Sequence, residues 1–302
     1  MTARAAVVAA ALCASSLRAG ADPTLVAIVA APDAAHALAI GMGGEVYEPD
    51  ANGWVRHAAG GVAVPLVVAA RAGTTIIAGG KDTAAFRFQR GVWHLLALGY
   101  HAKPVIGAGS RATCAIGRAV YALDHEPAVK LPDAPSPVLQ LAASSAGVAI
   151  ETERGVYRLG GAGKWQAIAG APQHVDQLVS DRWAIVSHAG TELTTGATTG
   201  PLGAFDAVTA TDAGVLLVAS EAAGQVTIRT FAGKHREESS TPVAPASPIA
   251  GIAADRDGKR FVVALRDGRI LSRGGDGTWS TATVRDELPQ GAPGAPPATS
   301  QQ

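Results

Sequence analysis

The chain has 302 residues, of which 48% are hydrophobic and 17% are charged, and its formal net charge at pH 7 is zero. This balance excludes an intrinsically disordered chain, which would be poor in apolar residues and rich in charged ones. The chain has no excess of basic residues to attract a polyanion, so nucleic acid is not an expected partner. Its length is sufficient for one large domain with a packed core.

Residues 1–21 have the pattern of a signal peptide. Arg4 provides a positive start, an apolar run follows over residues 5–17, and residues 19–21 form an A-x-A cleavage site. The apolar run is too short to span a bilayer, and Leu12 before Cys13 does not fit a lipoprotein anchor. We therefore expect an exported protein, periplasmic or secreted, without a membrane span.

Cleavage of the signal peptide would remove two bases, one cysteine and no acid. The remaining chain has 25 − 2 = 23 bases, 25 acids and a single cysteine, Cys114. One cysteine cannot form an internal disulfide, so we expect burial alone to stabilise the fold. Because Cys114 falls inside an expected strand, we interpret it as a small buried hydrophobe rather than a reactive thiol.

Tryptophan residues recur along the chain with a constant period. Trp54, Trp93, Trp165 and Trp279 are separated by 39, 72 and 114 residues, which equal one, two and three repeats of 39, 36 and 38 residues. A second marker, a small apolar residue followed by an aromatic residue or leucine, occurs at 46–47, 120–121, 156–157 and 270–271. Two independent markers with one period indicate an internal repeat.

Each repeat has the pattern of four short apolar strands separated by turn residues. The first, fourth and seventh repeats are the clearest, with strands expected at 25–30, 37–40, 45–47 and 54–57; at 138–142, 148–151, 156–159 and 165–168; and at 249–253, 261–265, 269–271 and 279–283. The second, third, fifth and sixth repeats begin near Leu66, Pro104, Val175 and Phe205.

Four strands in each repeat are typical of the blades of a β-propeller. A solenoid is the competing architecture, but it usually needs a helix or a very short coil in each repeat. The sequence therefore predicts an all-β fold, a β-propeller of about seven four-stranded blades over residues 22–287, with six or eight blades as alternatives. We expect the ring to close by packing between the first and last blades rather than by a shared strand. Residues 288–302, rich in Pro, Gly and Ala, are expected to be disordered.

The seventh repeat contains residues 268–272, Gly-Arg-Ile-Leu-Ser, followed by residues 274–279, Gly-Gly-Asp-Gly-Thr-Trp. This segment resembles the strand and turn of sialidase-type repeats (Asp-box, or BNR-like) and of photosystem-assembly-factor-like propellers. In the Asp-box pattern S-x-D-x-G-x-T-W, Gly274 and Asp276 stand where Asp and Gly are expected. The resemblance implies the propeller fold, and propellers of this kind include enzymes, lectin-like binders and assembly factors.

Motifs of catalysis and of cofactor binding are incomplete in this sequence. His125-Glu126 begins like a zinc-protease motif, but Val129 stands in the position of the second histidine. Residues 161–164 resemble the end of a phosphate-binding loop, but Trp165 follows where Ser or Thr is needed. We therefore expect no catalytic residues, no metal site and no cofactor.

Polar residues are expected to gather on one side of the propeller. With the four strands of a blade named a to d, the b–c and d–a loops emerge on the same side, around the mouth of the central channel. The candidate ligand-binding residues on these loops are Lys81, Arg118, Arg154, His188 and Arg266 (b–c loops) and Tyr100, His101 and His174 (d–a loops).

Two interpretations of these loop residues are open. The three arginines would together suit a ligand with a carboxylate or phosphate group. Alternatively, Lys81-Asp82, Glu153-Arg154 and Arg266-Asp267 are neutralised surface pairs. The three histidines would form a metal site only if they converge. The tryptophans of the d strands we interpret as blade-packing residues rather than ligand platforms.

We favour a non-catalytic binding or assembly scaffold, because it needs only a rigid propeller and an adaptable loop face. Its partner would be a protein, a small molecule or a carbohydrate. The alternatives are a lectin-like carbohydrate binder, which needs aromatic residues on the loops, and a sialidase-type glycoside hydrolase, which needs an arginine cluster. If Arg118, Arg154 and Arg266 point into one pocket with a carboxylate pair, the hydrolase is favoured.

Overall fold

The computed structural model describes residues 24–29, 37–51, 53–58, 61–62, 64–72, 75–80, 85–96, 105–109, 111–123, 128–144, 147–169, 175, 177–179, 183–186, 191–194, 197–201, 205–211, 213–232, 235–242, 244 and 246–285. In these ranges the chain forms strands and turns, and no helix is long and apolar enough to cross a membrane. The expected signal peptide and the expected tail from residue 288 onwards lie outside them.

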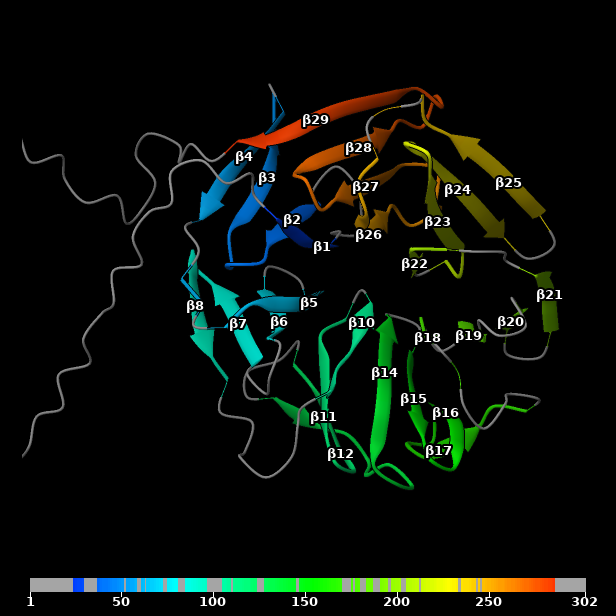
Figure 1. Ribbon diagram of the computed structural model, residues 1–302. Coiled ribbons are helices and arrows are strands. Elements are labelled where there is room, and N and C mark those ends of the chain that lie inside the picture. The colour runs from blue at the N-terminus through cyan, green and yellow to red at the C-terminus, as the bar shows by residue number, and fades with distance from the viewer. Residues whose placement is uncertain are drawn as a thin grey trace, which may run out of the picture.

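Seven four-stranded antiparallel sheets are formed by the described residues, and Figure 1 shows them arranged as blades around a common centre. Blades 1 to 3 consist of β1 (Leu25–Val29), β2 (Leu38–Gly41), β3 (Val46–Asp50) and β4 (Gly53–Ala58); β5 (Leu66–Ala72), β6 (Thr75–Gly80), β7 (Ala85–Gln89) and β8 (Val92–Leu95); and β9 (Val105–Ile106), β11 (Thr113–Ile116), β12 (Ala119–Ala122) and β13 (Val129–Lys130).

Blades 4 to 7 follow in chain order. They consist of β14 (Val138–Ser144), β15 (Gly147–Thr152), β16 (Gly155–Leu159) and β17 (Trp165–Ala167); β18 (Gln177–Leu178), β19 (Trp183–Val186), β20 (Thr191–Thr194) and β21 (Ala197–Pro201); β22 (Ala207–Ala210), β23 (Leu216–Ala222), β24 (Gln225–Ala232) and β25 (His235–Ser240); and β26 (Ile249–Ala254), β27 (Phe261–Leu265), β28 (Arg269–Arg273) and β29 (Trp279–Arg285). One further short strand, β10 (Ala108–Gly109), pairs in parallel with β14.

The first strand of each blade lies innermost. First strands of neighbouring blades contact each other, as β1 contacts β5 and β26, and β14 contacts β9 and β18. The predicted all-β propeller is therefore confirmed, and the described residues give the expected blade number. The predicted strands of the first, fourth and seventh repeats agree with the observed ones to within about two residues at most ends.

The blades are held together by apolar side chains on both faces of each sheet. In β27, every side chain is buried, and successive residues point to opposite faces. Val262 and Ala264 pack toward blade 1, whereas Phe261, Val263 and Leu265 pack toward blade 6. This two-sided burial explains why the inner strands are apolar almost throughout.

Cys114 confirms the interpretation made from the sequence. It lies in β11, the second strand of blade 3, is fully buried, and packs with Ile77 of blade 2. Burial raises the pKa of its thiol to about 12, so the thiol remains protonated at neutral pH.

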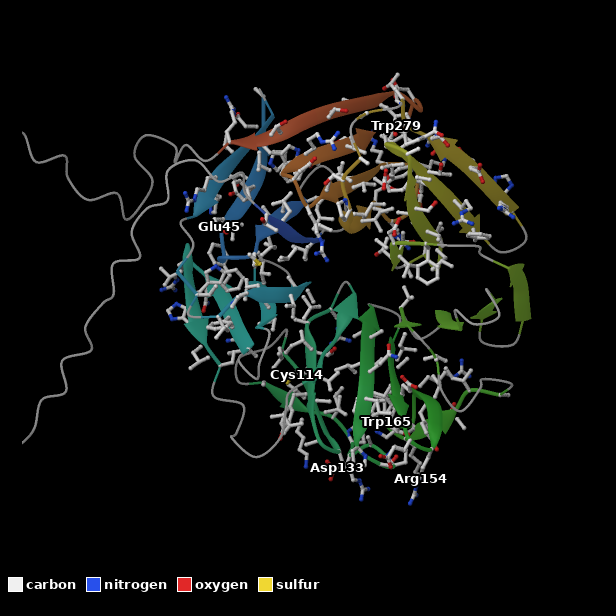
Figure 2. All side chains as sticks on the ribbon, viewed as in Figure 1. Glu45, Cys114, Asp133, Arg154, Trp165 and Trp279 are labelled. Atoms are coloured by element: carbon white, nitrogen blue, oxygen red, sulfur yellow. The ribbon has the colours of Figure 1, made fainter. Side chains whose placement is uncertain are left out.

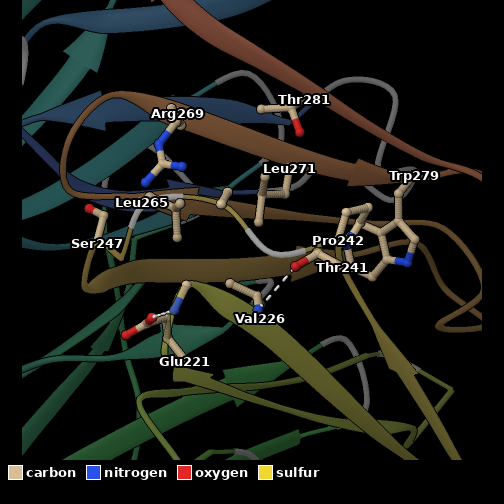
Figure 3. A pocket seen from close by; sticks show the side chains of 12 residues that line it. Glu221, Val226, Thr241, Pro242, Ser247, Leu265, Arg269, Leu271, Trp279 and Thr281 are labelled. Carbon is tan, nitrogen blue, oxygen red and sulfur yellow. Dashed lines mark hydrogen bonds between the residues drawn. The ribbon is translucent and has the colours of Figure 1, made fainter.

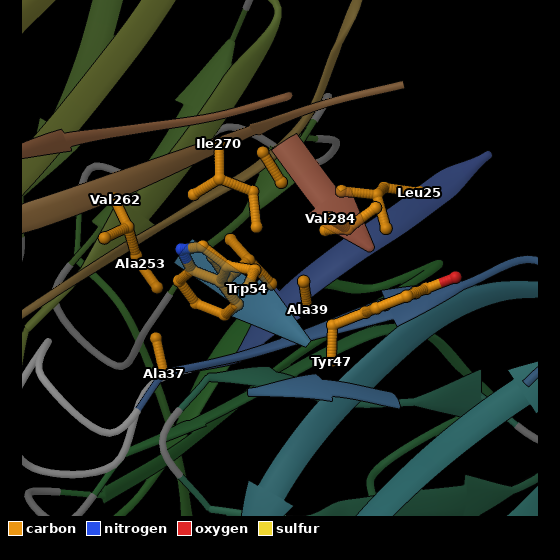
Figure 4. Close-up of a cluster of buried hydrophobic side chains, with 11 residues drawn as sticks. Leu25, Ala37, Ala39, Tyr47, Trp54, Ala253, Val262, Ile270 and Val284 are labelled. Atoms are coloured by element: carbon orange, nitrogen blue, oxygen red, sulfur yellow. The ribbon is translucent and has the colours of Figure 1, made fainter. Parts of the chain in front are cut away.

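The ring closes between blades 1 and 7 without exchange of a strand. The buried side chains of Trp54, Leu25 and Tyr47 from blade 1 pack with Val262 and Ile270 from blade 7 (Figure 4). As expected, each blade is one continuous segment of the chain. The structure adds a contact that was not predicted: the outermost strands β4 and β29 pair in parallel and join the two blades into one eight-stranded sheet.

Candidate functional site

The b–c turns lie on one side of the propeller, which we call the turn face: residues 42–45, 117–118, 153–154, 223–224 and 266–268 in the described part of the chain. Strand a of each blade begins on the same side, because its first residue pairs with the last residues of strand b. Examples are the pairs Leu66 with Gly80 and Val138 with Thr152. The b–c turns and the beginnings of the inner strands therefore form one surface.

Backbone hydrogen bonds from the following blade hold these turns in place. The N–H of Leu66, the first residue of β5, donates to the carbonyl of Met42 over 2.9 Å. Val138 N–H donates to Gly117 in the same way over 2.8 Å, and Leu25 N–H donates to Arg266 over 3.3 Å across the ring closure. The turn of one blade and the first strand of the next thus form a repeated interblade unit.

Arg118 lies exposed in the turn between β11 and β12, with its side chain anchored locally. Its backbone carbonyl accepts a hydrogen bond from Ala134 N–H over 2.8 Å, and its Nε donates to the carbonyl of Ala134 over 2.7 Å. These bonds fix the position of the guanidinium group, while its terminal nitrogens have no carboxylate partner among the described residues.

Arg154 is held by its backbone only. Its N–H donates to Thr152 Oγ1 over 3.1 Å, and its carbonyl accepts a hydrogen bond from Tyr157 Oη over 3.3 Å. Its side chain is exposed and points away from the blade at the edge of the molecule in Figure 2. The turn therefore presents a cation at a fixed position.

Arg266 is exposed in the turn between β27 and β28, next to Asp267 in the sequence. Asp267 instead pairs with Arg269, whose Nη2 lies 2.7 Å from the Asp267 carboxylate. Partial burial alone would raise the pKa of Asp267, but hydrogen bonds from the Arg269 side chain and backbone lower it below its ordinary value. Arg266 is therefore not neutralised by its sequence neighbour, contrary to the surface-pair interpretation of Arg266-Asp267.

Some arginines outside the turn face form ion pairs, whereas Arg90, Arg158, Arg256 and Arg260 are exposed there and, like those of the turn face, form no ion pair with a described residue. Arg236, Arg269, Arg273 and Arg285 each lie within 4.0 Å of an acidic side chain, at 3.8, 2.7, 3.0 and 3.4 Å. Arg118, Arg154 and Arg266 make no ion pair within the described ranges. The turn face thus carries three exposed cations without internal counter-charges.

The other candidate residues lie outside the described part of the chain: Lys81, Tyr100, His101, His174 and His188. Their convergence, and a site for a metal held by the three histidines, stay predictions. Within the described ranges no group of three or more His, Cys, Asp or Glu side chains is placed to hold a metal ion. Glu221, near the b–c turn of blade 6, lies in strand β23, one residue before its end.

A pocket of about 210 Å³ opens between blades 6 and 7 (Figure 3). Apolar side chains of both blades form its wall: Val226, Leu265, Leu271 and Trp279. Polar groups at its edge are engaged with the backbone, since Glu221 Oε1 accepts the Gly224 N–H over 2.7 Å. The pocket is smaller than a typical site for a drug-sized ligand and matches a single side chain or a small ring.

Trp279 of this pocket shows what the tryptophans of the outer strands do. Its ring meets Phe261 edge to face, with centroids 5.4 Å apart. In the other blades, Trp93 and Trp165 donate their indole N–H groups to the preceding blade, at Gly44 and Pro132. The tryptophans thus pack blades together, as predicted, and only Trp279 also lines the described pocket.

Sequence reasoning missed the interblade pocket and the hydrogen bonds that hold the turns. Glu221 and Trp279 are far apart in the sequence, and no motif links them. The pocket lies where Thr241, Pro242, Ala244 and Ser247, after the last strand of blade 6, meet side chains of blades 6 and 7. A repeat period locates strands, but it contains no signal for such a space.

Comparisons with known proteins identify a fold and no family. No family model matches the chain, and no curated protein matches it. Among solved structures, U3-55K is similar with a TM-score of 0.56 and 11% sequence identity, over 82% of this chain and 90% of that one. Virginiamycin B lyase from Staphylococcus aureus is similar with a TM-score of 0.41 and 9% identity, over 88% and 86% of the two chains. Both are β-propellers, and at these identities the likeness is one of fold alone.

Proposed function

We propose that this chain is an exported, non-catalytic binding or assembly scaffold whose working surface is the turn face. The observation that carries the proposal is the set of exposed arginines, Arg118, Arg154 and Arg266, without carboxylate partners among the described residues. Charged side chains on a surface are normally near opposite charges or in water, and exposed cations without internal counter-charges favour a partner of the other sign.

The backbone under these arginines supports the same proposal. The interblade hydrogen bonds at Gly117 and Arg266, and those of Thr152 and Tyr157 at Arg154, hold each turn before any partner arrives. A surface that is already ordered loses little conformational entropy on binding, which favours affinity. The partner we propose is therefore anionic and binds a preformed surface.

A pull-down with three forms of the chain, starting at Asp22, tests the proposal. The first is the wild type, and the second carries Arg118→Ala, Arg154→Ala and Arg266→Ala. The third is a matched control that removes three exposed cations elsewhere, with Arg158→Ala, Lys164→Ala and Arg256→Ala.

We expect a partner from envelope or secreted fractions to be retained by the wild type and the control, and lost by the turn-face variant. A partner that all three forms retain equally would contradict the turn face as the working surface. Export is tested separately, by fractionation of producing cells and N-terminal sequencing, which should find a chain that starts at Asp22.

A carbohydrate binder is the second candidate, and the pocket between blades 6 and 7 supports it. The ring of Trp279, the hydroxyl groups of Thr241 and Thr281 and the carboxylate of Glu221 line this pocket, and such groups suit the apolar face and the hydroxyls of a sugar. The resemblance of residues 268–279 to sialidase-type repeats also favours a carbohydrate ligand. The same resemblance supports a sialidase-type glycoside hydrolase as a further alternative.

A glycan array separates these candidates from the scaffold. Binding of a glycan that Trp279→Ala abolishes and the turn-face variant leaves intact would favour the carbohydrate binder. Release of sugar from a sialylated substrate, lost in the turn-face variant, would favour the hydrolase. Absence of both signals, together with a partner lost in the turn-face variant, would leave the scaffold.

A further inference from the structure

The innermost strand has a β-bulge at the same place in four blades. In β1, β5, β14 and β26 the pairing register shifts after the first residue, so that the second residue has no partner on strand b. The bulged residues are Val26, Val67, Leu139 and Ala250. A bulge redirects a side chain, and bulges are common next to binding sites, so the bulged residues are candidates for contact with a partner.

The bulge brings two large apolar side chains out of the interblade core. Val67 is 55% exposed and Leu139 is 44% exposed, although both belong to innermost strands. Their neighbours Leu66 and Val138 are buried against the preceding blade. An exposed valine and leucine at equivalent positions of two blades form apolar contact points on the turn face.

Each bulge lies directly beside the b–c turn of the preceding blade, because of the interblade hydrogen bonds. The bond from Val138 to Gly117 joins the beginning of β14, which contains Leu139, to the turn that contains Arg118, and the bond from Leu25 to Arg266 joins the beginning of β1, which contains Val26, to the turn of blade 7. The bond from Leu66 places Val67 next to Met42, which is 43% exposed. Cationic and apolar side chains therefore occur together at the junctions between blades 3 and 4 and between blades 7 and 1.

The acidic residues nearby do not cancel these cations. Asp133, on the connection that follows β13, pairs with Lys130 over 3.0 Å. Asp267, beside Arg266, pairs with Arg269. The net charge offered to a ligand at Arg118 and Arg266 is positive, so charge complementarity selects a ligand that carries carboxylates or phosphates.

We propose that the turn face binds an extended peptide segment of a partner protein that carries both acidic and large apolar side chains. The inference rests on the proposed function and specifies the partner. The contact points lie on different blades, so one small molecule does not reach them all, whereas an extended chain places side chains at regular intervals. The apolar side chains contact Val67 and Leu139, and the acidic ones contact Arg118 and Arg266.

A random nonapeptide library displayed on phage, selected against the chain from Asp22 onwards, provides the probe. Enriched peptides are then synthesised with a fluorescent label, and their affinities are measured by fluorescence anisotropy. The test variant carries Val67→Ser and Leu139→Ser. Its matched control carries Val92→Ser and Leu95→Ser on β8, the outermost strand of blade 2, where these side chains are 55% and 65% exposed.

We expect the enriched peptides to contain both acidic and apolar residues. Their affinity should fall by roughly tenfold or more in the Val67/Leu139 variant and in the turn-face arginine variant, but not in the β8 control. Enriched peptides that need the arginines but bind the Val67/Leu139 variant normally would overturn this inference and leave the proposed function intact.

Other results overturn the inference in different ways. Peptides that bind every variant equally would contradict both the inference and the proposed working surface. A failure of the library to enrich any peptide would overturn the inference. Decanoate, which has one carboxylate and an apolar chain, is tested as a second probe; if it binds and no peptide does, the apolar contact points belong to a free amphiphile, and the inference is overturned. Circular dichroism and thermal unfolding of each variant confirm that lost binding does not reflect lost fold.

Discussion

Trp93, on the outermost strand of blade 2, donates its indole N–H to the carbonyl oxygen of Gly44 in blade 1 over 2.6 Å. Trp165 of blade 4 makes the equivalent bond to Pro132 in the connection that follows blade 3, over 3.0 Å. Trp54 of blade 1 packs with Val262 and Ile270 of blade 7. The periodic tryptophans thus attach each of these blades to the blade that precedes it in the ring.

The first prediction concerns the hydrogen bond from Trp93 to Gly44. Trp93→Phe keeps an aromatic ring but removes the donor, and leaves the carbonyl of the buried Gly44 without its indole partner. We expect a loss of about 1–2 kcal/mol in the free energy of unfolding, measured by urea denaturation. Trp165→Phe should cost less, because the hydrogen bond from Trp165 to Pro132 is exposed to solvent. Trp279→Phe is the control, because its indole N–H donates to no described residue; an equal loss there would show that ring size, not the bond, is responsible.

Glycines with positive φ provide a matched pair. Gly224 (φ 82°) and Gly91 (φ 81°) have the same backbone conformation, but a Cβ at Gly224 would clash with the carbonyl of Ala244, whereas one at Gly91 meets nothing within 4 Å. Gly91→Ala should cost about 1 kcal/mol for the backbone alone. Gly224→Ala should cost roughly 1–3 kcal/mol more, because the turn and the d–a connection must separate. Equal losses in the free energy of unfolding for the two variants, measured by chemical denaturation, would contradict the close approach of Gly224 to the carbonyl of Ala244.

The closure of the ring depends on Val284 of β29. Its side chain is buried between blades 1 and 7, and its backbone lies opposite Trp54 of β4. Val284→Asp places a carboxylate in this apolar contact and should lower the free energy of unfolding by roughly 3 kcal/mol or more. Thr283→Asp, at the exposed adjacent position, should change it by less than about 0.5 kcal/mol. Similar losses in both variants would mean that blades 1 and 7 do not meet at Val284.

The turn before Trp279 responds to pH through Asp276. The hydroxyl of Thr278 donates to the Asp276 carboxylate over 2.6 Å and the Thr278 N–H over 3.0 Å, and these bonds lower the pKa of Asp276 below 3.8. The folded state therefore binds this proton less readily than the unfolded state does, so the stabilisation is present above the unfolded pKa and is lost as pH falls through the folded one.

Asp276→Ala isolates this contribution. The difference in stability between wild type and variant should be constant near neutral pH and should shrink as the pH falls below 3.8, in denaturation curves recorded at several pH values. Asp257→Ala, in the exposed turn between β26 and β27, is the control for the loss of an exposed carboxylate. A difference that persists unchanged at low pH would contradict the role of the ionised carboxylate.

Much of the fold could be predicted from the sequence, because the residues that recur with the repeat period are the same residues that pack the blades together. Trp54, Trp93, Trp165 and Trp279 recur since each occupies the beginning of an outermost strand and packs toward the preceding blade. The apolar inner strands follow from burial on both faces. Strand positions are therefore determined by composition and period.

The surface could be predicted only in part. The order of strands in a blade placed Arg118, Arg154 and Arg266 on the b–c turns correctly. The pairing of Asp267 with Arg269 rather than Arg266 depends on the conformation of the turn, which the sequence order does not reveal. The bulges at Val67 and Leu139 were also missed, since an extra residue in a strand that is apolar throughout does not disturb its pattern.

Site-specific photo-crosslinking tests most directly whether the turn face is the working surface. Met42→p-benzoylphenylalanine places the crosslinker in the b–c turn of blade 1, and Ala162→p-benzoylphenylalanine places it in the c–d turn of blade 4, on the opposite side. Irradiation with the exported fraction should give a defined adduct from position 42 and none from position 162. Adducts from position 162 alone, or equally from both positions, would contradict the turn face as the binding surface.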